Sequence, residues 1–148
     1  MGVEIERKFL VKKEKWQAIR PSNGELIIQG YLQKDPNKTV RVRVKNNSGY
    51  ITIKGKSKGI TRLEFEYEIP VNEAKEMIQE FCDRFIEKTR YFFEHEGFTW
   101  EVDEFLSPKK GLILAEIELN SEEQKFSLPN WIDKEVSDDL QYFNSNMI

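Results

Sequence analysis

Residues 3–11 read VEIERKFLV, and the two-residue alternation of this stretch decides the fold. Successive side chains of a β-strand point to opposite faces, so Glu4, Glu6 and Lys8 share one face of the predicted strand. The other face is mainly apolar and is suited to packing in a core. The stretch therefore predicts a strand at residues 3–11 with three charges on one side, two of them alike.

The same alternation recurs along most of the chain and predicts about eight strands. Short turns rich in Gly, Pro and Asn separate several neighbouring stretches, which is typical of antiparallel hairpins. The predicted strands cover residues 3–11, 25–34, 38–46, 49–56, 60–70, 86–97, 98–105 and 112–120.

Three helices are expected between or after these strands. Residues 71–85 place apolar side chains at helical spacing, and Asn72 is available as the N-cap. A shorter helix is expected at residues 13–20. Another is expected after Ser121, whose spacing to Gln124 is typical of a capping box. Helices packed on the apolar face of a sheet make α+β the predicted class.

The composition limits the function classes. The 148 residues fit one ordinary domain, and no repeat, low-complexity tract or linker divides residues 1–148. Cys82 is the only cysteine, which excludes an internal disulfide and a cysteine-cluster metal site. Without an apolar run of membrane or signal-peptide length, we expect a cytoplasmic protein with no membrane partner. The net charge of −3 argues against a nucleic-acid partner.

Each predicted strand sorts into an apolar face and a polar face. We expect the helices to bury the apolar face. A sheet face exposed to water would give the same alternation. The polar face carries Glu4, Glu6, Lys8, Gln29, Tyr31, Gln33, Arg41, Arg43, Lys45, Thr52, Lys54, Lys56, Arg62, Glu64, Glu66, Glu68, Lys88, Arg90, Glu101, Asp103, Glu116 and Glu118.

Like charges on this face often lie two residues apart, as in Glu4 and Glu6 or Arg41 and Arg43. At a separation of about 7 Å, such a pair costs roughly 0.6 kcal/mol in water and roughly 2.4 kcal/mol at an effective dielectric of about 20. Enclosed pairs therefore need ligands. Carboxylate pairs suit a divalent cation such as Mg²⁺, and clustered Arg and Lys suit phosphate oxygens. Together they predict a site for a metal ion and a polyphosphate.

The ordered set of motifs resembles the CYTH superfamily, also called triphosphate tunnel metalloenzymes. EIERKFLV at 4–11 is similar to the ExExK signature of that family. The other motifs follow in the family's order over essentially the whole chain, namely QGYL at 29–32, RVR at 41–43, TIK at 52–54, RLEFE at 62–66, KTR at 88–90, WEVD at 100–103 and AEIEL at 115–119.

The resemblance implies a closed antiparallel eight-stranded β-barrel, with the charged face inward around a tunnel and helices packed outside. It also implies a small-molecule triphosphate substrate and assistance by Mg²⁺ or Mn²⁺. Activities in the family include tripolyphosphatase, thiamine triphosphatase, RNA triphosphatase and class IV adenylyl cyclase. Homodimers occur in the family, and nothing in this sequence requires one.

The resemblance also assigns roles to individual residues. The predicted metal ligands are Glu4, Glu6, Asp103, Glu116 and Glu118. The predicted phosphate-binding and catalytic side chains are Lys8, Arg41, Arg43, Lys54, Arg62, Lys88 and Arg90, with Lys56 and Tyr31 as further substrate contacts. Glu64 and Glu66 could bind metal or orient the neighbouring basic side chains.

Three functions stay open at this point. The leading one is a metal-dependent phosphohydrolase that cleaves inorganic tripolyphosphate or an organic triphosphate. The second is an adenylyl cyclase, which is disfavoured because class IV cyclases carry a His-Phe pair upstream of the ExExK strand, where only Met1-Gly2-Val3 precede Glu4. The third is a non-catalytic module that binds polyphosphate or nucleotides.

Overall fold

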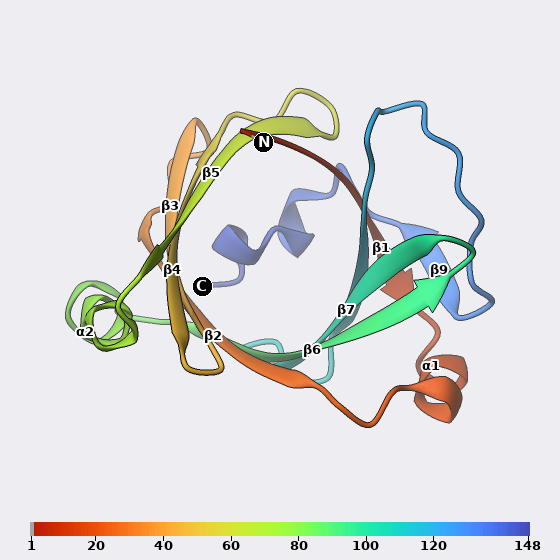
Figure 1. The fold of residues 1–148 in the computed structure, drawn as a ribbon, viewed down its shortest axis with the longest axis horizontal. Coiled ribbons are helices and arrows are strands. Elements are labelled where there is room, and N and C mark those ends of the chain that lie inside the picture. The colour runs from red at the N-terminus through yellow and green to blue at the C-terminus, as the bar shows by residue number, and fades with distance from the viewer. Residues whose placement is uncertain (1) are drawn as a thin grey trace.

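Eight antiparallel strands close into a barrel in the computed structural model, which describes residues 2–148 (Figure 1). The strands are β1 (Val3–Val11), β2 (Glu25–Gln33), β3 (Lys38–Lys45), β4 (Ser48–Gly55), β5 (Thr61–Ile69), β6 (Ile86–His95), β7 (Phe98–Ser107) and β8 (Ile113–Glu118). Their order around the barrel is β5-β4-β3-β2-β6-β7-β8-β1, and pairing of β1 with β5 closes the ring. The predicted eight-stranded antiparallel barrel is therefore confirmed.

The first strand closes the barrel because it pairs on both sides. Its beginning pairs with β5, with Glu4 opposite Arg62. Its middle pairs with β8, with Glu6 opposite Glu118. Its end also pairs with a short ninth strand, β9 (Ile132–Glu135), which lies outside the ring of eight. The stretch VEIERKFLV thus joins the two ends of the sheet.

Two α-helices lie on the outside of the barrel, α1 (Lys13–Ile19) and α2 (Val71–Phe81) (Figure 1). Helix α2 packs over β2, β3 and β4 through the buried Ala74 and Ile78. The close approach requires glycine at Gly49, where a Cβ atom would lie 2.7 Å from the Cβ of Ala74. No helix among residues 2–148 combines the length and the apolar character that crossing a membrane requires.

Two helix predictions need correction at α2. The helix ends at Phe81 instead of residue 85, and Phe81 is exposed, because the chain turns there to enter β6. Its N-cap is Pro70 instead of Asn72, and no side chain caps the first turn. The fixed φ of proline suits the residue that begins a helix.

The helix predicted after Ser121 is wrong. The backbone N–H of Asn120 donates to Oε1 of Gln124 at 2.6 Å, and the N–H of Gln124 donates to the carbonyl of Ser121. This turn does not continue as a helix, because the following Phe126 packs against Trp100 on the barrel wall. The spacing of Ser121 and Gln124 thus gives a turn without the side-chain cap of Ser121, and tertiary packing keeps the segment from forming a helix.

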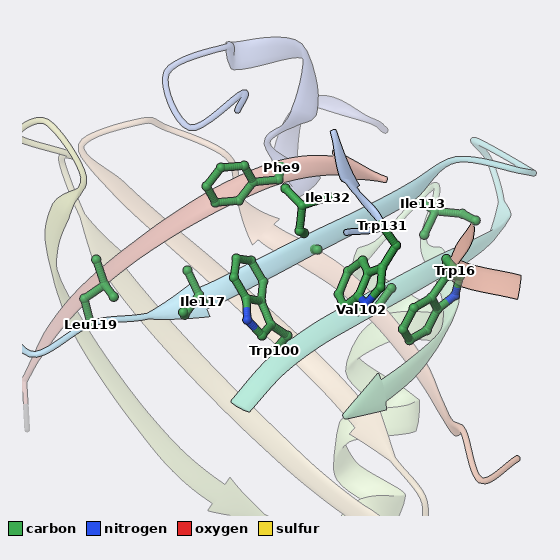
Figure 2. Packing of buried hydrophobic residues seen from close by; sticks show 10 residues of the cluster. Phe9, Trp16, Trp100, Val102, Ile113, Ile117, Leu119, Trp131 and Ile132 are labelled. Carbon is green, nitrogen blue, oxygen red and sulfur yellow. The ribbon is translucent and has the colours of Figure 1, made fainter. Parts of the chain in front are cut away.

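The main core lies outside the barrel wall, against β1, β7 and β8 (Figure 2). The Trp131 ring centroid lies 4.8 Å from that of Trp16 and 6.0 Å from that of Trp100. Phe93 approaches Trp131 edge-on at 5.4 Å. These aromatic rings fasten α1 and the segment before β9 to the strands.

The apolar face is mostly buried as predicted, and the main exception is β5, with Ile53 of β4 also 40% exposed. The exposed fractions are 55% for Leu63, 44% for Phe65 and 58% for Tyr67. The physical reason is that α2 packs mainly on β2, β3 and β4 and meets β5 at its end, where Ile69 packs in the cluster of Ala74 and Ile78. Alternation therefore identifies the outward face but cannot tell which strands the helices cover.

The aromatic core gives a stability prediction. Trp131→Ala should lower the free energy of unfolding by about 3–5 kcal/mol, because it leaves a large cavity among the rings of Trp16, Phe93 and Trp100. Urea denaturation followed by circular dichroism measures this change. Leu128→Ala, at an exposed position of the same segment, should stay within about 0.5 kcal/mol of the wild type. Similar losses for both variants would contradict the role given to Trp131.

Candidate active site

The charged face of the strands lines the inside of the barrel around a cavity of about 260 Å³. Most of the predicted site residues border this cavity. They are Glu4, Glu6, Lys8, Tyr31, Arg41, Arg43, Lys54, Arg62, Lys88, Arg90, Glu116 and Glu118.

Two predicted site residues do not border the cavity. Lys56 lies just beyond the end of β4 and is exposed. Asp103 lies behind the lining, 1% exposed, where its carboxylate accepts hydrogen bonds from Arg90 Nε at 2.7 Å and from Arg90 Nη2 at 2.9 Å. Lys88 Nζ lies 2.8 Å from the same carboxylate. These contacts favour a role for Asp103 in positioning the two cations, and its role as a metal ligand stays a prediction.

One side of the lumen is acidic, because β1 and β8 bring Glu4, Glu6, Glu116 and Glu118 together. Glu6 lies directly opposite Glu118 in the strand register. Burial and then repulsion from Glu116 and Glu4 raise the pKa of Glu6 well above its ordinary value. Burial and repulsion from Glu4 also raise the pKa of Glu118. A cation placed here would relieve this repulsion, so the donor set fits a divalent ion.

Glu116 behaves differently from its neighbours. Burial acts to raise its pKa, but Lys8 and a hydrogen bond from Glu6 bring the pKa down to about 2. Within residues 2–148, no three carboxylate, imidazole or thiol groups converge as a ready-made metal cage. Mg²⁺ in particular is usually bound by one or two carboxylates together with water and substrate phosphate oxygens, and not by a complete protein cage.

Glu64 and Glu66 both contact basic or hydroxyl side chains. Lys54 Nζ lies 3.3 Å from Oε2 of Glu64 and donates to Oε2 of Glu4 at 2.9 Å. Glu66 Oε2 accepts from the hydroxyl of Thr52 at 2.7 Å and lies 3.4 Å from Arg41 Nη2. These contacts favour the orienting role for Glu64 and Glu66 over a metal-binding one.

The opposite side of the lumen is basic. Arg43 donates from Nε and Nη2 to Oε1 of Gln29, at 2.9 and 2.7 Å. Burial and repulsion from other arginines lower the pKa of Arg43. Burial also lowers the pKa of Lys88, to about 7, against the attraction of Asp103. Lys88 and Arg90 share the enclosed carboxylate of Asp103, and Arg43 is held by the neutral Gln29, so this wall has an excess of positive charge that suits a polyanion.

Several lumen residues were missing from the predicted site. Glu101 lies opposite Glu116 in the register and 3.4 Å from Arg90 Nη1. Its strand parity had placed it on the charged face, so that signal was available. The C-terminal residues Ser137, Phe143, Asn144 and Ser145 also line the cavity. No strand period covers them, so alternation could not have found them.

A closed barrel with carboxylates on one side of its lumen and Arg and Lys on the other defines a tunnel-type anion-binding protein. The CYTH domain profile matches residues 2–147, and the chain belongs to the CYTH family.

Relatives of known name support the same family. The inorganic triphosphatase of Acetivibrio thermocellus is 52% identical over 149 aligned positions, spanning 100% of this chain and 94% of that protein. The inorganic triphosphatase of Nitrosomonas europaea is 35% identical, over 95% of this chain and 93% of that protein. The crystal structure of the inorganic triphosphatase NE1496 superimposes with a TM-score of 0.64 at 32% identity, covering 97% and 96% of the two chains. A conserved hypothetical protein from Pyrococcus furiosus shares the fold, with a TM-score of 0.62 at 23% identity and coverage of 81% and 80%.

The ion pairs of Asp103 give a prediction for the free protein. Burial opposes ionisation of this carboxyl, but Arg90 and Lys88 lower its pKa far below the ordinary value. Asp103→Ala should therefore cost about 3–5 kcal/mol of unfolding free energy, because two buried cations lose their partner. Urea denaturation without divalent ions measures the loss, and inorganic phosphate should restore part of it by replacing the negative charge that Lys88 and Arg90 share, although Arg90 keeps Glu101 and Glu116 nearby.

The control for this measurement is Asp83→Ala, which removes an exposed carboxylate between α2 and β6. It should stay within about 0.5 kcal/mol of the wild type. A loss below about 1 kcal/mol for Asp103→Ala would contradict the positioning role.

Proposed function

We propose that this protein is a divalent-metal-dependent triphosphatase that hydrolyses inorganic tripolyphosphate or a related triphosphate inside the barrel. The observation that carries the proposal is the acidic wall of β1 and β8 facing a basic wall of β3 and β6 across one lumen. The relatives named inorganic triphosphatase, at 52% and 35% identity over nearly the whole chain, support the inorganic substrate.

The basic side chains bind the phosphate oxygens. Arg43 and Arg90 are fixed by Gln29 and Asp103, so their positive charge is in place before the substrate arrives, and Asp103 also holds the Lys88 side chain beside them. Charge that develops on the phosphate oxygens during P–O cleavage is therefore stabilised without rearrangement of the protein. Tyr31 lines the same cavity and is a further candidate for substrate contact.

The carboxylates of Glu4, Glu6, Glu116 and Glu118 would hold Mg²⁺ or Mn²⁺, whose chemistry there is charge neutralisation on the phosphates and a lowered pKa for a water. The protein's own contribution on this side is to keep the carboxylates close together, with Glu4 buried and Glu118 exposed. Their raised pKa values are the consequence for Glu4, Glu6 and Glu118. Lys54 holds Glu4 through hydrogen bonds of 2.9 and 3.1 Å.

Product analysis separates the three functions. Pure protein is incubated with Mg²⁺ or Mn²⁺ and with tripolyphosphate, ATP or thiamine triphosphate. Orthophosphate release supports hydrolysis, whereas cyclic AMP with pyrophosphate supports a cyclase. Binding without turnover supports a non-catalytic module. Few apolar side chains line the lumen, among them Tyr31, Ile60 and Phe143, which disfavours a buried adenine and with it the cyclase.

Substitution of the acidic wall tests the metal ligands. Glu4→Ala and Glu118→Ala should each lower metal-dependent turnover of tripolyphosphate roughly 100-fold and raise the metal concentration needed for half-maximal rate. Glu76→Ala, at an exposed position of α2, serves as the control with unchanged rate. Full turnover in either glutamate variant would show that the metal assignment is wrong.

A further inference from the structure

The inward-facing rows of three strands change from charged to apolar at one end of the barrel. Ile86 continues the row of Lys88 on β6, and Leu114 continues the row of Glu116 on β8. Phe105 occupies the corresponding place on β7. All three are at most 2% exposed and form a cluster with Val136 and Met147 of the C-terminal segment. Apolar side chains therefore fill this end of the lumen.

Residues 136–148, here called the C-terminal segment, cross the same end of the barrel. The N–H of Val136 donates to the carbonyl of Lys8 near the end of β1. At the other side, Lys34 Nζ donates to the backbone oxygen of Ile148, just beyond the end of β2. Figure 1 shows the segment within the outline of the ring, where it forms the short 3₁₀ turns η1 (Leu140–Tyr142) and η2 (Asn144–Asn146).

Polar atoms of the C-terminal segment bind lumen side chains from three strands. The carbonyl of Tyr142 accepts from Lys8 Nζ at 2.9 Å. Oδ1 of Asn144 accepts from Gln29 Nε2 at 3.1 Å and from Lys88 Nζ at 3.0 Å. The segment is thus tied to β1, β2 and β6 from inside the barrel. Because Asn144 and Ser145 also border the cavity, the segment forms its floor.

Exposure along the lumen agrees with one closed end. Gln29 and Lys88, which bind the C-terminal segment, are 0% and 1% exposed. Farther from Phe105 and Leu114 along the same strands, Glu101 has a side-chain exposure of 38% and Glu118 is exposed. Water therefore reaches the charged side chains from the end opposite the segment.

We propose that the tunnel has a single entrance and a blind end formed by the C-terminal segment, and that it accepts only phosphate chains with at least one free, unesterified terminal phosphate. This inference rests on the proposed triphosphatase function and narrows its substrate class. A free terminal phosphate has more anionic oxygens than an internal one, and the blind end offers Lys8 and Lys88 to bind them. An esterified terminus loses charge and adds an alkyl group that has no outlet. A tunnel open at both ends would let such a chain pass through.

Two ligands of equal charge test the proposal. Monomethyl triphosphate has one free end, whereas P1,P4-dimethyl tetraphosphate has none. The readouts are competition with tripolyphosphate hydrolysis and the rise in melting temperature of the wild-type protein with Mg²⁺, which reports binding without turnover. We expect the dimethyl compound to bind at least about 100-fold more weakly than the monomethyl compound, because the groups at the blind end are left without a partner.

Each outcome decides the question. Equal binding of the two ligands would overturn the blind end. Absence of binding by both ligands would also overturn the proposal. The monomethyl compound has a free terminal phosphate for the blind end, so its failure to bind would mean that a methyl ester is already rejected at the entrance. If the expected difference appears in melting temperature but tripolyphosphate releases no orthophosphate, the proposed function fails while the single-entrance inference stands.

Variants of the C-terminal segment link the selectivity to its side chains. Shortening both lumen-facing side chains in Phe143→Ala/Asn144→Ala should reduce the ratio between the two ligands about tenfold. Gln141→Ala is the control, because this side chain is exposed and its amide donates to Oδ2 of Asp139 in the same segment. General destabilisation would weaken both ligands alike and leave the ratio unchanged. An unchanged ratio in the double variant would show that the segment does not select for free ends.

Discussion

The ion pairs between Asp103, Arg90 and Lys88 are the interaction on which the basic wall of the lumen depends. Buried cations without a partner are strongly destabilising, and β6 contributes two of them side by side. The enclosed carboxylate of Asp103 lowers the free-energy cost of burying these cations, and the wall keeps a net positive charge. Gln29 accepts two hydrogen bonds from Arg43, as Asp103 does from Arg90. Because the Gln29 amide is neutral, it leaves the positive charge of Arg43 uncancelled. The protein therefore keeps a fixed, cationic surface that a polyanion can occupy.

A charged lumen requires that the apolar core be built elsewhere. In this barrel the core lies outside the wall, where Trp16, Trp100 and Trp131 pack on β1, β7 and β8, and α2 covers β2 to β4. The cover is incomplete, and the row of Leu63, Phe65 and Tyr67 on β5 stays exposed. The arrangement reverses the usual barrel, in which apolar side chains fill the interior.

Alternation along the strands predicted the barrel wall and most of the side chains that border the lumen, because a period of two fixes which face each residue occupies. It could not predict depth, so Asp103 and Glu116 looked equivalent although only Glu116 borders the cavity. It also could not predict packing by irregular segments. Asn144 reaches Lys88 from the C-terminal segment, and Phe126 keeps its own segment from becoming a helix, and both depend on contacts far apart in sequence.

The pairings of β1 also determine when the fold can form during synthesis. Residues 3–11 leave the ribosome before the other strands of the barrel, yet they pair with β8 and β9, which are made last among these strands. The ring therefore stays open until β8 has emerged, and until then β1 has one edge unpaired. Long-range closure of this kind slows folding, and an unpaired edge exposes the nascent chain to association with other strands. The charges of Glu4, Glu6 and Lys8 disfavour association of β1 with other strands before the barrel closes, and the same side chains then line the lumen.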